Sequence, residues 1–174
     1  MNYAVQREQS DMYLEAFKDI LRRNSMNFLT LEVSDDYKDT QEATDMLIKI
    51  EGGDVALRVR NPSCKFRDFT VRTRSKYGGK TEIDKLKEGF GDWYLYGWGD
   101  GNGNVLEWIL IDLNKLRQFK LLDKDRQERW NYDGTKFIGI PIGELQMTGC
   151  LISKQLKENT QTDVDKFIFQ KINN

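Results

Sequence analysis

The chain has 174 residues, a formal net charge of −1 at pH 7 and 39% hydrophobic residues, which together indicate one soluble domain over residues 1–174. No apolar run reaches the roughly 20 residues that span a bilayer, and the N-terminus lacks an apolar signal segment, so we expect a cytoplasmic protein that contacts no membrane. The absence of histidine excludes Ser-His-Asp and Cys-His catalysis. We expect the two cysteines, Cys64 and Cys150, to be reduced thiols.

The N-terminal part predicts a helix followed by a strand. Apolar residues recur at helical spacing from Asp11 to about Arg23, and residues 28–33 alternate as a strand does. Residues 34–42 form an acidic loop, for which solvation is favoured over a metal site. The helical stripe consists of Tyr13, Leu14, Phe17, Ile20 and Leu21.

Three strands are predicted next, at residues 45–50, 55–60 and 69–74, because apolar and polar side chains alternate in each. If they pair as an antiparallel meander, one face of the sheet is apolar. The other face then carries a row of charged residues. These are Asp45, Lys49, Arg58, Arg60, Arg72 and Arg74.

Positive charge is concentrated in this region. Residues 56–80 contain eight Lys or Arg and one acid, Asp68, for a net of +7, whereas the rest of the chain has a net of −8. A basic strip in an otherwise acidic protein indicates an anionic partner. The alternative is a sheet face that is simply solvated, as is common in antiparallel sheets.

A short helix and an aromatic strand follow. Thr81 and Asp84 have the spacing of a capping box, and Glu82 and Lys85 lie on one side of the same helix, where a surface ion pair is the simpler interpretation. On the strand at 93–98, three aromatic side chains share a face and offer a ladder on which bases could stack, although aromatics at this spacing more often pack in a core. They are Tyr94, Tyr96 and Trp98.

The remaining segments are less distinctive. A turn at 99–104 has acidic and amide residues at calcium-loop spacing, but Val105 and Ile111 occupy positions that need Gly and Glu, so calcium is rejected. Further elements are predicted in order along the chain. They are a buried strand at 105–111, a helix at 112–122 with Phe119 on its apolar side, a solvated segment at 123–129, a strand at 135–142, residues 143–156 without a clear period, and a C-terminal segment whose type stays open.

This order of helix, three strands, helix and strand resembles the αβββαβ core of the PD-(D/E)XK nucleases. The resemblance implies an α+β (α/β) fold with a mixed, mainly antiparallel sheet flanked by helices. In that family an Asp at a strand start, an acid-x-Lys motif on the next strand and sometimes a Glu of the first helix bind Mg²⁺. Asp45 matches the Asp and Glu15 the helical acid, but the motif falls on Arg58-Val59-Arg60 or, in a second register that opens at Asp54, on Arg72-Thr73-Arg74.

Arginines in place of the motif change the expected chemistry. Two guanidinium groups repel a divalent cation but bind phosphate well. We therefore expect a nuclease-like domain that binds nucleic acid or another phosphate-bearing ligand through Arg58, Arg60, Arg72 and Arg74, with cleavage left open. An alternative is magnesium-dependent hydrolysis in which Glu82 supplies the displaced acid. In that case the catalytic set is Asp45, Glu82 and Lys85, and the metal ligands are Asp45 and Glu82.

Four segments also resemble uncharacterised proteins of phages and mobile elements, which implies an origin and no activity. They are residues 42–45, 56–60, 68–72 and 91–97. A third hypothesis is therefore a non-enzymatic interaction protein, for example a phage factor that inhibits a host protein. The arginine face or the aromatic ladder would then be the contact surface.

Overall fold

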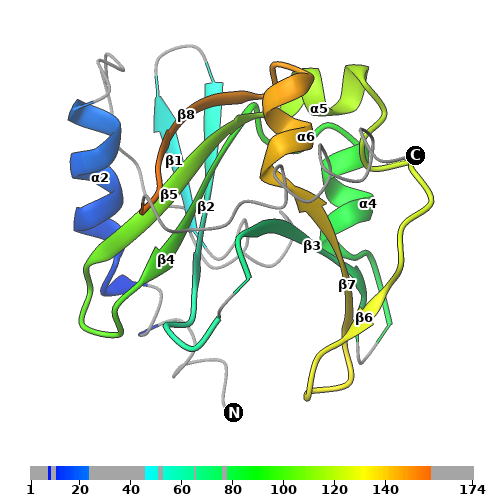
Figure 1. The fold of residues 1–174 in the computed structure, drawn as a ribbon, viewed down its shortest axis with the longest axis horizontal. Coiled ribbons are helices and arrows are strands. Elements are labelled where there is room, and N and C mark those ends of the chain that lie inside the picture. Colours follow the sequence, from blue (N-terminus) through cyan, green and yellow to red (C-terminus); the bar gives the residue numbers. More distant parts are fainter. Residues whose placement is uncertain are drawn as a thin grey trace, which may run out of the picture.

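The computed structural model describes residue 8 and residues 11–23, 46–50, 53–64, 66–75 and 78–157. Within these ranges the chain forms two β-sheets and short helices (Figure 1), and the expected α+β fold with a mixed, mainly antiparallel central sheet is confirmed. The strand predicted at 28–33, the acidic loop at 34–42 and the C-terminal segment after residue 157 lie outside the described residues. So does Asp45.

The central sheet has five strands in the order β1-β2-β4-β5-β8. Only β2 and β4 are parallel, with Val55 beside Trp93 and Arg60 beside Trp98, and the other described pairs are antiparallel. A parallel pair needs a long crossover, and here the crossover contains β3 and α4. The strands are β1 (Met46–Ile50), β2 (Gly53–Arg60), β4 (Trp93–Gly99), β5 (Val105–Asp112) and β8 (Leu151–Gln155).

The second sheet has the order β3-β7-β6, with β3 (Asp68–Arg74), β7 (Lys136–Pro141) and β6 (Arg129–Trp130) all antiparallel. The expected three-strand meander is therefore wrong, because β1 pairs with β2 but β3 pairs with β7. The physical reason is that β2 already has a partner on each side, β1 and β4, and offers no free edge to β3. Period-two alternation predicts a strand but carries no information about its partner.

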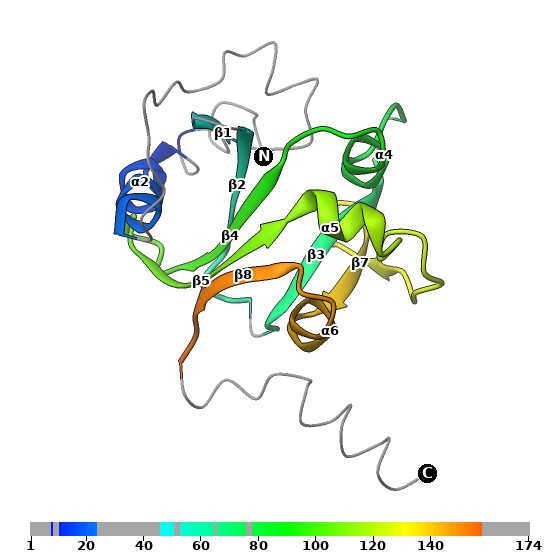
Figure 2. The same cartoon turned by 90° about the horizontal axis from the view of Figure 1, so that it is seen from above.

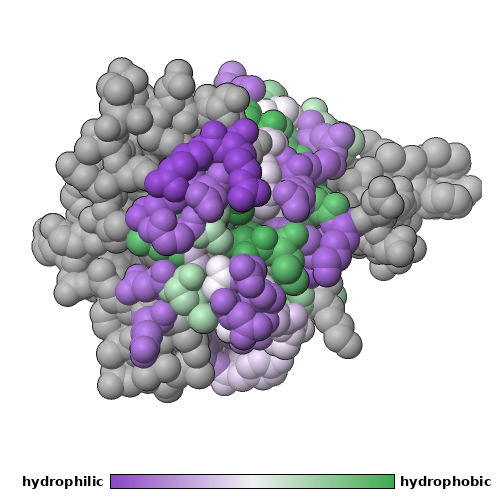
Figure 3. All heavy atoms as spheres, turned by 90° about the vertical axis from the view of Figure 1, so that its left-hand side faces the viewer, coloured by the Kyte–Doolittle hydropathy of each residue, from purple (hydrophilic) through white to green (hydrophobic). Residues whose placement is uncertain are grey.

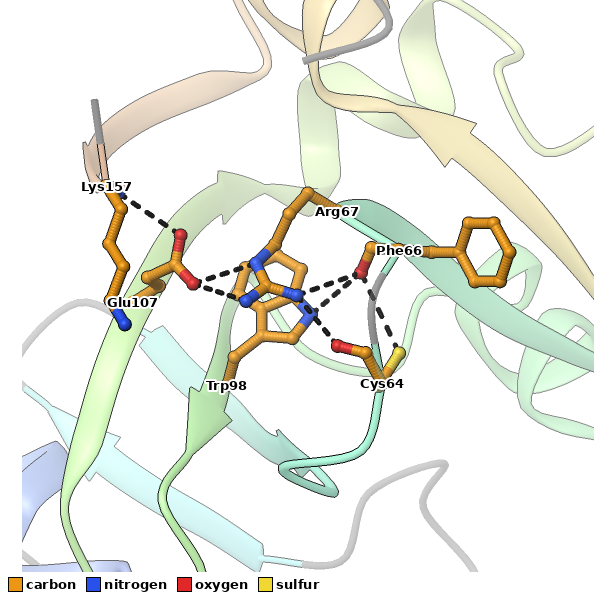
Figure 4. Close-up of polar contacts among 6 residues, drawn as sticks. All are labelled: Cys64, Phe66, Arg67, Trp98, Glu107 and Lys157. Atoms are coloured by element: carbon orange, nitrogen blue, oxygen red, sulfur yellow. Dashed lines mark hydrogen bonds and ion pairs between the residues drawn. The ribbon is translucent and has the colours of Figure 1, made fainter. Parts of the chain in front are cut away.

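Arg67 fixes the connection that leads from β2 into the second sheet (Figure 4). Its Nε and Nη2 both donate to Oε2 of Glu107 on β5, the first at 2.8 Å, and its Nη1 donates to the Cys64 carbonyl at 2.8 Å. The guanidinium also lies 5.1 Å from the centre of the Trp98 ring. Glu107 is 1% exposed and also accepts from the Lys157 backbone N–H at 3.1 Å, so one buried carboxylate joins three segments of the chain.

Helices cover both faces of the central sheet (Figure 2). On one face, α2 (Leu14–Arg23) buries Phe17 and Leu21 against β2, β4 and β5. Gly97 allows this close approach, because a Cβ there would lie 3.1 Å from the Phe17 ring. On the other face lie the second sheet and three short helices. They are α4 (Glu82–Lys87), α5 (Leu113–Gln118) and α6 (Ile142–Met147).

Two expectations about the C-terminal half need correction, and one segment without a prediction contains a helix and a strand. The helix predicted at 112–122 ends at Gln118, and Phe119 is half exposed where burial was expected. Residues 143–156, which have no clear period, contain most of α6 and all of β8. The segment at 123–129 is not wholly solvated, because Lys124 and Arg126 bind Glu144 at 2.6 and 2.7 Å.

The predicted capping box of α4 is confirmed. The Asp84 carboxylate accepts hydrogen bonds from the hydroxyl and the backbone N–H of Thr81, at 2.6 and 2.9 Å. These bonds hold the pKa of Asp84 below its ordinary value. The carboxylate therefore stabilises the fold at neutral pH, and this contribution is lost as the pH falls through the lowered pKa.

We expect Asp84→Ala to lower the free energy of unfolding by about 1 kcal/mol at pH 7, the usual value of a helix cap. The difference from wild type should shrink in acid, since the protonated carboxyl no longer accepts both hydrogen bonds. Urea denaturation at neutral and acidic pH measures it, with Asp84→Asn as the conservative control. A loss that does not change with pH would show that the carboxylate charge plays no part.

Seen from the side of α2, the described residues are mainly hydrophilic around a smaller apolar area (Figure 3). No helix within the described ranges is long and apolar enough to cross a bilayer. Both cysteines are free thiols, Cys150 buried and Cys64 half-buried.

Candidate functional site

The four predicted arginines do not share one sheet face. Arg58 and Arg60 are on β2 of the central sheet, whereas Arg72 and Arg74 are on β3 of the second sheet. They therefore form no continuous arginine row, and each has to be considered in its own surroundings.

Glu82 joins the two sheets from the first turn of α4. Its Oε2 accepts from Arg58 Nη1 and, at 2.8 Å, from the backbone N–H of Arg72, and its Oε1 accepts from the Tyr94 hydroxyl at 2.7 Å. Glu82 is 7% exposed, so it is not the surface partner of Lys85 that the helical spacing suggested. The Arg72 N–H belongs to the edge of β3 that faces away from β7, and Glu82 satisfies it.

The described residues bring together no set of ligands for magnesium. Asp45 lies outside them, Lys85 is half-buried on α4, and both Glu82 oxygens already accept hydrogen bonds. The helical acid of the resemblance, Glu15, lies on α2, across the central sheet from α4, and binds Lys18 at 2.6 Å (Figure 2). Among the residues that the structure describes, no group of three or more Asp, Glu, Cys or His side chains is arranged to hold a metal ion.

The aromatic ladder of β4 is core. Tyr94, Tyr96 and Trp98 are all buried, and the Phe69 ring packs edge-on against both tyrosines, with centroids 5.1 and 5.4 Å away. The Tyr96 hydroxyl lies 2.6 Å from the Thr70 hydroxyl, and burial raises the pKa of Tyr96 to about 12. The ladder is therefore not available to stack bases or to contact a partner.

An exposed group of aromatic and cationic side chains lies instead around β6, the outer strand of the second sheet. Trp130 is 62% exposed, and its ring centre lies 4.7 Å from Lys136 Nζ and 5.7 Å from Arg74 Cζ. Phe66 is 67% exposed, with Arg129 Cζ 5.6 Å from its ring centre. We call this group the aromatic–cation edge. Its members are Phe66, Arg74, Arg129, Trp130, Tyr132 and Lys136.

The positive charge of this edge is only partly neutralised. Lys136 binds Glu128 at 2.8 Å, and Arg129 lies 3.6 Å from the Asp68 carboxylate. The hydrogen bond from Lys136, together with the charges of Lys136 and Arg74, holds the pKa of Glu128 below its ordinary value. Arg74 is exposed, and none of the described carboxylates lies within 4.0 Å of its guanidinium.

Arg60 has no acidic partner among the described residues. Its Nη2 lies 3.8 Å from the Cys64 thiol, and no described carboxylate is within ion-pair distance. The chain runs from Cys64 through Phe66 to β3, which connects Arg60 to the aromatic–cation edge through one short segment. A phosphate-binding role for Arg60, Arg72 and Arg74 stays a prediction, whereas Arg58 is committed to Glu82.

Sequence reasoning did not single out Trp130, Tyr132 or Arg129. The available signal was a pair of large aromatic residues in a highly charged segment without apolar alternation. Such a segment contributes little to a core, so core packing does not explain these aromatic residues. Such residues are candidates for contact with a partner.

Neither the protein-family models nor the curated proteins that were compared with this chain give a match. Its function therefore has to be argued from the chemistry of its surface.

Proposed function

We propose that this protein is a nucleic-acid-binding module whose contact surface is the aromatic–cation edge around β6. The observation that supports this is the exposed Trp130 ring with Lys136 and Arg74 beside it. Cations attract the phosphate backbone, and exposed aromatic rings accept bases, so the two together suit a nucleic acid better than a small anion.

The distribution of charge along the chain supports the same proposal. Residues 56–80 carry a net charge of +7, and among their described cations two, Arg58 and Arg67, bind buried carboxylates. Both of those carboxylates, Glu82 and Glu107, come from outside this stretch. The remaining surplus of cations leaves the region attractive to a polyanion while the protein as a whole stays slightly acidic.

The described residues support the two other hypotheses less well. Hydrolysis by Asp45, Glu82 and Lys85 requires Glu82 to bind a cation, but its carboxylate already accepts from three donors, one of which is the positively charged Arg58. A host protein as partner would also use exposed aromatics and arginine, although a stretch with a net charge of +7 favours an anionic partner.

The proposal predicts that the double variant Arg74→Ala/Arg129→Ala binds oligonucleotides more weakly and with a shallower salt dependence. Each lost phosphate contact should reduce the slope of log Kd against log salt by about 0.7 to 0.9, so the two changes together should reduce it by about 1.5. Fluorescence anisotropy with a labelled oligonucleotide at several salt concentrations measures the slope.

The double variant Arg22→Ala/Arg23→Ala is the matched control, because it removes the same charge from α2, on the far side of the central sheet from β6 (Figure 1). It should leave the slope within about 0.3 of wild type if binding is local. An equal loss in both variants would mean that net charge alone drives association, and the edge would not be the site.

A further inference from the structure

We infer that the nucleic acid bound at the aromatic–cation edge is single-stranded and that one of its unpaired bases stacks on Trp130. This inference rests on the proposed function, since it specifies the substrate of the same surface. It requires an open ring, cations placed beside that ring, and a position on the molecule that a strand can reach.

The ring of Trp130 is open to a ligand. Trp130 is 62% exposed in a strand of two residues at the outer edge of the second sheet. Most of the residue is accessible to solvent, even with Lys136 and Arg74 over its ring. Exposure of apolar indole surface to water is unfavourable, so a base that covers the ring gains free energy by removing this surface from water.

Two cations lie over the Trp130 ring and are close enough to contact the phosphates of a nucleotide bound there. Trp130 pairs with Lys136 in the β6–β7 register. Lys136 also pairs with Arg74 of β3, next to a register irregularity between residues 72 and 74. One aromatic ring therefore has a cation from each of two neighbouring strands beside it. Stacking on a ring combined with ionic contacts to the flanking phosphates is the common way to bind single strands.

The opposite side of β6 provides a comparison within the same binding surface. Arg129 and Trp130 are successive strand residues, so their side chains project from opposite faces of the sheet. Phe66 lies with Arg129, whose Cζ is 5.6 Å from its ring centre. A Phe66→Ala variant thus removes an equally exposed aromatic from the other face.

An unpaired base is the expected occupant because the faces of paired bases are covered by their neighbours in a duplex. A duplex offers Trp130 only phosphates and groove edges, unless a base is unstacked at a cost of a few kcal/mol per step. Sequence preference should be weak, since every base has a face that can stack.

The test uses the full chain and three probes with equal numbers of phosphates: oligo-dT, an abasic oligonucleotide of the same length, and a blunt duplex. Tryptophan emission reports stacking directly, because Trp98 and Trp108 are buried and Trp93 is half-buried, which leaves Trp130 as the most exposed of the four tryptophans. Affinities are measured by anisotropy for wild type and for Trp130→Ala, Trp130→Phe and Phe66→Ala, each checked for folding by circular dichroism.

We expect oligo-dT to quench the tryptophan emission and the abasic probe and the duplex to leave it nearly unchanged. Trp130→Ala should weaken oligo-dT binding by about 5- to 150-fold and leave abasic binding unaltered, while Trp130→Phe keeps most of the affinity. Phe66→Ala should have a smaller effect than Trp130→Ala.

Two results would overturn the inference in distinguishable ways. Equal affinity for oligo-dT, abasic probe and duplex, with no effect of Trp130→Ala, removes the stacking inference and leaves the proposed phosphate binding in place. Failure of all three probes to bind at low salt removes the proposed function and the inference together.

Discussion

Glu82→Ala is expected to lower the free energy of unfolding by about 3–5 kcal/mol. The substitution leaves Arg58, whose side chain is 14% exposed, without its buried carboxylate, and removal of one partner of a buried ion pair typically costs this amount. It also takes an acceptor from the Tyr94 hydroxyl and from the Arg72 N–H at the edge of β3. Urea denaturation followed by circular dichroism measures the loss.

Two further variants test whether the loss of stability comes from the buried carboxylate. Glu82→Gln keeps the shape and one acceptor oxygen but loses the charge, so a smaller loss of about 1.5–3 kcal/mol is expected. Lys80→Ala removes an exposed ion pair with Glu88 next to the same helix, and it should change stability by no more than about 1 kcal/mol. A Glu82→Ala variant as stable as Lys80→Ala would contradict the role assigned to this carboxylate.

Glu82 was a candidate catalytic residue in the sequence, but its contacts in the fold are structural. Glu82 binds Arg58, which lies 24 residues earlier in the sequence, and it accepts a hydrogen bond from the Arg72 N–H at the edge of the second sheet. The result is a polar link between two sheets that share no backbone ladder. If such a link were only partly satisfied, it would cost more than an apolar contact, which is why the three donors matter together.

Most strands were predictable from the sequence because their signal is local. Alternation in 55–60, 69–74 and 93–98 depends only on neighbouring residues, and each of these segments is a strand. Pairing was not predictable, because β2 finds its second partner in β4, beyond a crossover that includes β3 and α4. The missed helix α6 is a six-residue element, too short to show a clear period.

The candidate site was harder to predict than the fold. The sequence placed Arg58 and Arg72 on one surface, but their surroundings depend on Glu82, which long-range folding brings to them. Trp130 belongs to a strand of only two residues in a charged segment, where no alternation marks it. The excess of cations in 56–80 does not depend on pairing, and the anionic partner that it indicates stays a prediction.

Loss of the buried carboxylate of Glu107 should have an effect as large as that of Glu82, because it binds Arg67 through two nitrogens and also holds the Lys157 N–H (Figure 4). We expect Glu107→Ala to cost about 3–5 kcal/mol of unfolding free energy. Arg67→Lys should recover little compared with Arg67→Ala, since an ammonium can neither donate in the same fork nor stack equally well on Trp98.

The double variant Arg67→Ala/Glu107→Ala separates the ion pair from its surroundings. If the two groups act as one unit, the double variant should lose less stability than the sum of the single variants, since neither charge is then left alone in the interior. Hydrogen exchange adds a local readout: the amide of Lys157 should exchange faster in Glu107→Ala than in Arg67→Ala, because only the first removes its acceptor. Additive losses with unchanged exchange at Lys157 would mean that Arg67 and Glu107 stabilise the fold independently, with Arg67 acting through the Cys64 carbonyl and the Trp98 ring.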